Sequence, residues 1–145
     1  MRLWFAFLCL LAVGACGAES PHPAATGPAA GAQLTFAGAL SGSLSNLRIA
    51  ECVPGSFSFQ GEVAGAGVSV LVRLAGADAK PGSHPAVSAA GHPLVSLASV
   101  GNLGPTGSAT GGRVTVGPDS VSGSLDVDIA LTRGGVTHLA GSWSC

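Results

Sequence analysis

The sequence predicts an all-β protein, a small antiparallel β-sandwich or barrel of about seven to nine strands with one disulfide. From Gln33 onward, apolar residues alternate with small or polar residues, which is the two-residue period of a strand. Short segments rich in Gly, Pro, Asp and Ser separate these runs and supply turns. No stretch combines the period of an amphipathic helix with capping residues.

Four runs show the clearest alternation, and each places its apolar side chains on one face. They are residues 34–40, 57–63, 68–74 and 121–131. The apolar-face positions in these runs are Leu34, Phe36, Leu40, Phe57, Phe59, Val63, Val68, Val70, Val72, Leu74, Val121, Leu125, Val127, Ile129 and Leu131. We expect these side chains to form the core, because one face of each strand must be buried against another element.

The last two strands are predicted to form a hairpin around Arg133-Gly134-Gly135. If these residues make a three-residue loop, Ile129 faces Leu139 and the apolar positions of both strands share one face. Gly123 lies on that face as well, and a glycine there leaves room for a large neighbour. We expect Trp143, which lies on the same face of the last strand, to fill that room.

Residues 76–112 have a less regular pattern. The segment 77–85 is rich in Pro, Gly and charged residues and predicts an exposed loop. Residues 93–100 predict a strand, although both of its faces carry apolar residues. Residues 106–112 are predicted to be either a flexible loop or an edge strand softened by glycine.

The N-terminus has the layout of a secretory signal. One arginine, Arg2, precedes an unbroken apolar run, and small residues follow at Val13-Gly14-Ala15. The run is shorter than the roughly 20 residues that a membrane-spanning helix needs. Two interpretations therefore remain for these residues: a lipoprotein signal, or a plain signal peptide that is cut after Ala15.

The four residues Val13-Gly14-Ala15-Cys16 resemble the lipobox of bacterial lipoproteins. This resemblance implies a thioether between Cys16 and diacylglycerol, acyl chains such as palmitate, and cleavage before Cys16. It also implies a lipid-anchored protein on the extracytoplasmic face of the cell membrane or in an outer membrane. The chain then divides into a signal peptide at 1–15, the lipidated cysteine with a Pro/Ala/Gly tether at 16–32, and a single β domain at 33–145.

Secretion and one disulfide account for all four cysteines. The lipobox resemblance implies that Cys9 leaves with the signal peptide and that Cys16 is acylated. The remaining two, Cys52 and Cys145, can pair in an oxidising compartment. Their bond would fasten the last strand to the first third of the domain and stabilise it by roughly 4 kcal/mol through chain entropy. A redox role is not expected, because the sequence contains no Cys-x-x-Cys.

Charge and motif content argue against several functions. Six Lys and Arg against seven Asp and Glu leave a net charge of −1, which offers no basic surface for nucleic acid. The sequence has neither Gly-x-Ser-x-Gly nor a phosphate-binding loop, so we expect this chain to have no enzymatic activity and no cofactor. His84 and His92, each followed by a proline, are only weak candidates for metal ligands, because zinc or copper is held by three or four converging groups.

Asp126 and Asp128 are the only closely paired carboxylates on a predicted strand. They lie two residues apart and therefore project from the same face. Carboxylates in this arrangement can serve glycoside hydrolysis only when they flank a cleft, and this face is expected to be open. We interpret the pair as a charged outer face that discourages association through strand edges.

The overall plan is similar to that of small actinobacterial lipoproteins of the mycobacterial 19-kDa antigen type. The likeness rests on the lipobox at 13–16, the tether, Cys52 and the closing Trp143-Ser144-Cys145. Lipoproteins of this type join a lipobox cysteine to a Gly/Val-rich β domain through a low-complexity tether. The tether of this chain lacks the threonine richness of that type.

These features predict a lipid-anchored envelope or surface protein whose β domain is a non-enzymatic binding or structural module. Its partners would be the membrane, through Cys16, and an unidentified envelope protein, with no nucleic acid. The alternative is a carrier of a small apolar ligand, such as a lipid, in a barrel interior, which the apolar segment 94–100 suggests. A metal-binding protein is a third hypothesis, and only the histidines suggest it.

Overall fold

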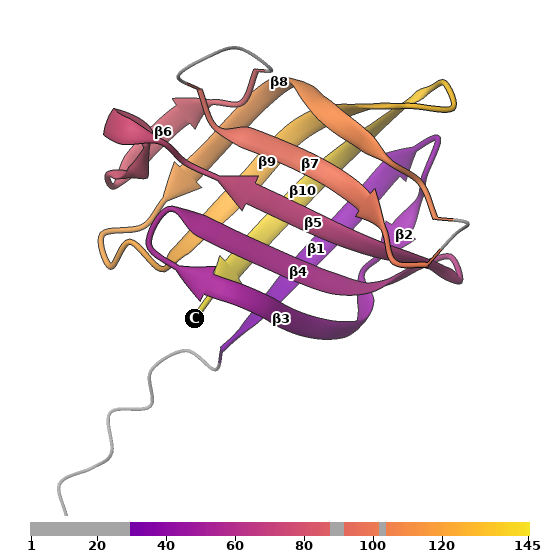
Figure 1. Cartoon of the computed structure of the whole chain (residues 1–145), viewed down its shortest axis with the longest axis horizontal. Helices are drawn as coiled ribbons and strands as arrows, with labels where there is room; N and C mark the ends of the chain where they lie inside the picture. Colours follow the sequence, from indigo (N-terminus) through magenta and orange to yellow (C-terminus); the bar gives the residue numbers. More distant parts are fainter. Residues whose placement is uncertain (1–29, 88–91, 102–103) are drawn as a thin grey trace, which may run out of the picture.

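The computed structural model describes residues 30–87, 92–101 and 104–145 (Figure 1). The described chain forms ten β-strands and one turn of 3₁₀ helix. The elements are β1 (Gly31–Gly38), β2 (Gly42–Ser43), β3 (Ser45–Val53), β4 (Ser56–Val63), β5 (Ala66–Arg73), η1 (Gly76–Ala79), β6 (Gly82–Pro85), β7 (Leu94–Ser99), β8 (Gly107–Val116), β9 (Ser122–Leu131) and β10 (Val136–Ser144).

All ten strands belong to one antiparallel sheet that curls into a nearly closed barrel (Figure 1). The strand order is β2-β1-β10-β9-β8-β7-β5-β4-β3, and β6 pairs with β8 outside this path. The predicted all-β antiparallel class is therefore confirmed. The strand number exceeds the expected seven to nine because β2 and β6, of two and four residues, are too short to show a period in the sequence.

The barrel closes at one end through the nearly continuous segment β2–β3. Its first residues pair with β1, where Thr35 faces Ser43, and the Leu44 N–H donates to the Leu34 carbonyl at 2.8 Å. From Ser45 onward the same segment pairs with β4 instead. The edges of β1 and β3 separate beyond this point, and we call the gap between them the seam.

The predicted core positions are buried, except for Val121 and Leu131, which are only partly buried. The apolar faces of β4, β5, β9 and β10 meet in the barrel, with Phe57, Phe59, Ile129 and Leu139 fully inaccessible. Trp143 fills the space among them and is 3% exposed; its ring centroid lies 5.0 Å from that of Phe57. Large side chains therefore occupy the barrel interior.

Strand β3 departs from strict alternation. Its pairing with β4 shifts between Ser45 and Arg48 and again between Ile49 and Glu51, so an extra residue is inserted at each β-bulge. The second bulge reverses which residues face inward, and as a result Cys52 packs against the core together with Ile49. The two-residue alternation of a regular strand does not reveal this strand in the sequence, because its inward-facing residues are three positions apart at each bulge.

The register predicted for the last hairpin is wrong by two residues. Leu139 pairs with Val127, and Ile129 pairs with Thr137. The loop has the expected three residues but is shifted by one position: the Leu131 N–H donates to the Gly135 carbonyl at 3.0 Å, so residues 132–134 form the loop. The predicted faces are nevertheless correct, since a shift by an even number of residues leaves every side chain on the same side of the sheet.

The structure also defines three segments of the region 76–112, whose sequence pattern is irregular. Residues 77–85, expected as an exposed loop, contain η1 and β6. In β7 the inward residues Val95 and Leu97 are buried, whereas Leu94 and Val100 are 42% and 48% exposed, so the segment 94–100 has one buried face and not two. Residues 106–112 lead into and form part of β8, which is paired with β9 along its whole length.

Candidate functional site

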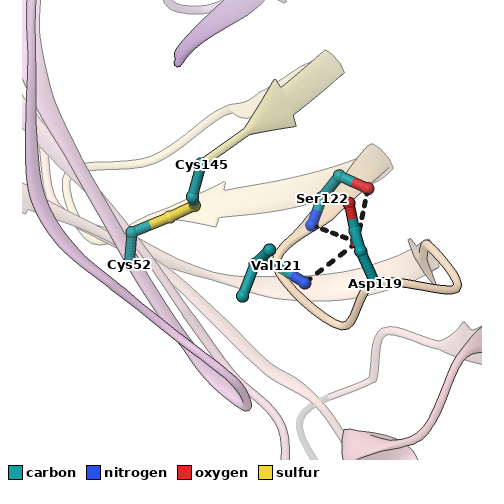
Figure 2. The surroundings of a disulfide bond; sticks show 5 residues. All are labelled: Cys52, Asp119, Val121, Ser122 and Cys145. Atoms are coloured by element: carbon teal, nitrogen blue, oxygen red, sulfur yellow. Dashed lines mark hydrogen bonds between the residues drawn. A yellow bond between two sulfur atoms is a disulfide. The ribbon is translucent and has the colours of Figure 1, made fainter. Parts of the chain in front are cut away.

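The seam is bridged by the predicted disulfide. Cys52 ends the inward row of β3, Cys145 follows β10, and their Cα atoms lie 6.2 Å apart although 93 residues separate them in sequence (Figure 2). The Cys145 N–H also donates to the Val121 carbonyl at 3.3 Å. The cysteine pairing expected from the sequence is confirmed, and the bond holds together the two sides of the gap that backbone pairing leaves open.

A groove of about 370 Å³ runs along the seam. Ala32 and Gln33 of β1 form one wall, Leu47 of β3 forms the other, and Ser142 and Trp143 of β10 also line it. The indole Nε1 of Trp143 is buried and has no hydrogen-bond partner within the described residues. Among the described residues, no ionisable side chain lines this groove, so they offer contact surface and polar backbone groups but no acid, base or strong nucleophile.

Two further hollows lie near the opposite end of the barrel. One of about 190 Å³ is lined by Leu40, Leu131 and Arg133, and a larger, shallower one of about 470 Å³ lies over β7, β8 and β9. Arg133, in the smaller hollow, is the only charged residue among the described residues that line the two. Both hollows lie outside the filled core, and neither brings paired ionisable groups together.

Neither of the two histidines considered as metal ligands is brought together with two further ligand groups within the described residues. The His84 ring contacts Asp78 Oδ1 through Nδ1 at 3.1 Å and the Lys80 carbonyl through Nε2 at 2.9 Å, so its own loop occupies both nitrogens. His92 lies exposed before β7. Across residues 30–87, 92–101 and 104–145, no group of three His, Cys, Asp or Glu side chains could hold a metal ion.

Asp126 and Asp128 project from the open outer face of β9, as expected, and they share a histidine. His138 lies directly opposite Asp128, with Nδ1 2.9 Å from its Oδ1, while Nε2 is 3.4 Å from Asp126 Oδ1. All three side chains are exposed. The cluster is a solvated ion-pair group on a flat sheet surface, and none of the three hollows described above borders it.

Asp119 organises the turn between β8 and β9, beside the disulfide (Figure 2). Its Oδ1 accepts hydrogen bonds from the Ser122 hydroxyl at 2.7 Å and from the N–H groups of Ser122 and Val121 at 2.9 and 3.0 Å. The Ser122 hydroxyl, followed by these two N–H groups, lowers the pKa of Asp119 below its usual value of 3.8. The sequence marked this segment only as a turn; an Asp three residues before a Ser is the pattern that indicates such a network.

Searches of protein-family models, of curated proteins and of solved structures each find no match to this chain. In the part of the chain that the structure describes, no helix has the length and apolar character needed to cross a membrane. The predicted signal peptide, Cys16, His22 and nearly all of the tether lie outside the described residues.

Proposed function

We propose that this chain is a lipid-anchored protein of a bacterial envelope, whose β domain is a non-enzymatic module that binds a partner or serves a structural role. The observation that carries the proposal is the Cys52–Cys145 bond across the seam. Disulfides of this kind persist in oxidising, extracytoplasmic compartments. A secreted small domain gains stability from such a bond, whereas a cytosolic domain would be kept reduced.

The position of the disulfide also suits an N-terminal anchor. Strand β1 begins at Gly31, which pairs with Ser144 next to the bonded Cys145 (Figure 1). An anchor at Cys16 would therefore pull on the end of the barrel that the covalent bond reinforces. The tether of 16–32 could hold the domain at most roughly 50 Å from the membrane, at about 3.3 Å per extended residue.

The hollows support a binding or structural role more than catalysis. In the described part of the chain, no ionisable side chain lines the seam groove or the hollow over β7, β8 and β9, and Arg133 is the only one that lines the smallest hollow. Enzymes instead converge nucleophiles, acids and bases with perturbed pKa values in one cleft. Carriage of a small apolar ligand is the second candidate; because side chains fill the barrel, such a ligand would have to occupy an outer hollow.

The anchor is tested by expressing the whole chain, with its own N-terminus, in a bacterial host. We expect the domain to appear in the membrane fraction and its N-terminal peptide to carry diacylglycerol on Cys16. The variant Cys16→Ser should lose the lipid and leave the membrane, whereas the matched variant Cys9→Ser should keep both. An N-terminal cysteine without a lipid, found by mass spectrometry of the mature protein, would contradict the anchor.

The binding role needs a separate measurement. Crosslinking of the anchored protein in its native envelope should yield a reproducible partner that is lost when the domain is deleted. Absence of any crosslinked partner, together with an unchanged envelope in the deletion strain, would argue against a binding module. Native mass spectrometry after gentle extraction distinguishes the second candidate, because a carrier would retain a ligand mass.

A further inference from the structure

Strand β6 is attached to the barrel differently from the other strands. It lies outside the main strand order and pairs only with the last part of β8, from Gly82 opposite Val116 to Pro85 opposite Arg113. The Ala86 N–H then donates to the Gly112 carbonyl at 2.9 Å. We call residues 76–86, which comprise η1 and β6, the β6 strap.

The β6 strap covers an edge of β8 that β7 leaves free. Strand β7 pairs with β8 at only two positions, Ser96 with Ser108 and Leu97 with Gly107. The strap thus completes the barrel wall beside the rest of β8, and its last residue, Ala86, is fully buried. Displacement of the strap would expose the backbone edge of β8 and part of the core.

His84 connects the two halves of the strap. Its ring is only 14% exposed, and the Asp78 side chain in η1 is 16% exposed. Nδ1 lies 3.1 Å from Asp78 Oδ1, and Nε2 lies 2.9 Å from the Lys80 carbonyl. The Lys80 carbonyl can only accept, so Nε2 carries the N–H of that hydrogen bond, whereas Asp78 Oδ1 forms an ion pair with Nδ1 when the ring is charged. A neutral imidazole has one N–H, whereas the imidazolium has two.

We propose that His84 in its imidazolium form latches the β6 strap onto β8, and that the strap loosens when the ring loses its second proton. With one N–H, the ring keeps one bond and turns a nitrogen lone pair toward the other acceptor. The second oxygen of Asp78, Oδ2, is buried and has no partner within the described residues. Loss of the cation therefore leaves a shielded carboxylate without compensation, which is unfavourable.

Few other charges act on this latch. On β8, Val114 faces His84, and the neighbouring Arg113 reaches the strap, with Nη1 3.4 Å from Ser83 Oγ. Lys80 is exposed and contributes its carbonyl to the ring. Among the residues that the structure describes, Asp78 is thus the only carboxylate in contact with His84. The latch therefore needs a charged His84 ring together with an ionised Asp78, and it weakens when the ring becomes neutral.

His138 provides an internal control. Its two nitrogens also face acceptors, the carboxylates of Asp126 and Asp128, but the ring is 45% exposed. It lies on β10, which is paired along its length with both β9 and β1. The charge on His138 therefore acts at a solvated surface, where water and salt screen it, and it does not hold a loosely attached strand in place.

The test is amide hydrogen exchange of Ala86, measured by NMR between about pH 5 and about pH 8 and corrected for intrinsic exchange. We expect protection of Ala86 to fall roughly tenfold at the higher pH, in step with loss of one His84 ring proton seen in nitrogen shifts. The His138→Gln variant should behave as the wild type does.

The variant Asp78→Asn distinguishes the latch from general destabilisation of the strap. An asparagine amide can donate to the lone pair of a neutral His84, so the strap should stay protected at both pH values. The proposal is overturned if His84 is singly protonated while Ala86 is protected, if protection of Ala86 in the wild type does not change with pH, or if Asp78→Asn retains the full pH dependence.

Discussion

Gly123 of β9 lies directly opposite Trp143 of β10, and the indole ring occupies the space that a β-carbon on Gly123 would fill. The atoms nearest to that space are Cζ2 and Cη2 of the indole and the Thr115 carbonyl. The tryptophan, in turn, packs against Phe57 and Phe59 across the barrel. One glycine thus makes room for the largest side chain of the core.

The variant Gly123→Ala is expected to lower the free energy of unfolding by about 1–3 kcal/mol, because the added methyl group collides with a packed ring and a backbone carbonyl. Urea denaturation measures the change. Gly111→Ala in β8 is the matched control, since a β-carbon there meets no atom within 4 Å. Equal losses in the two variants would show that packing against Trp143 is not the cause.

Removal of the disulfide by the double variant Cys52→Ser/Cys145→Ser should cost about 4–5 kcal/mol, because the bond closes a loop of 93 residues in the unfolded chain. Both residues are replaced so that no free thiol remains. Reduced wild type should have the same urea midpoint as the double variant. Uptake of a thiol label by unfolded, unreduced wild type would contradict the pairing.

Two substitutions of Trp143 distinguish the contribution of its ring to stability from that of its N–H group. Because Nε1 has no partner within the described residues, Trp143→Phe loses little besides volume, and we expect it to be distinctly milder than Trp143→Ala. The alanine variant should cost about 3–5 kcal/mol, since it leaves a cavity beside Phe57 and Phe59. Val136→Ala, at an exposed position, should change stability by less than about 0.5 kcal/mol. Equal losses for the phenylalanine and alanine variants would show that the indole N–H is essential.

Asp119 should make the β8–β9 turn sensitive to acid. Its pKa is lowered in the folded protein, so its contribution to stability is present above the usual value of 3.8 and is lost as pH falls through the lower folded value. In Asp119→Asn, this part of the acid dependence should disappear. Thermal melts at a series of pH values below about 5 provide the measurement. An unchanged slope in the variant would mean that other carboxylates cause the acid sensitivity.

Several elements could be predicted from local pattern alone. The inward faces of β4, β5, β9 and β10 follow from alternation between neighbouring residues, which does not require knowledge of the partner strand. Strand β3 could not be predicted in this way, because its two bulges are features of its pairing with β4. The contact between His84 and Asp78 was also missed, since each residue by itself is an ordinary loop residue.

By itself, the sequence determined the all-β class, the faces of the regular strands, the cysteines that pair and the glycine that admits Trp143. These depend on the two-residue period and on the chemistry of single side chains. Only the tertiary structure decided the register of the last hairpin, the closure through β2–β3, the position of the disulfide at the seam and the attachment of β6. All four depend on which distant backbone groups bond to one another, and a shift of pairing by two residues leaves the pattern of polar and apolar faces unchanged.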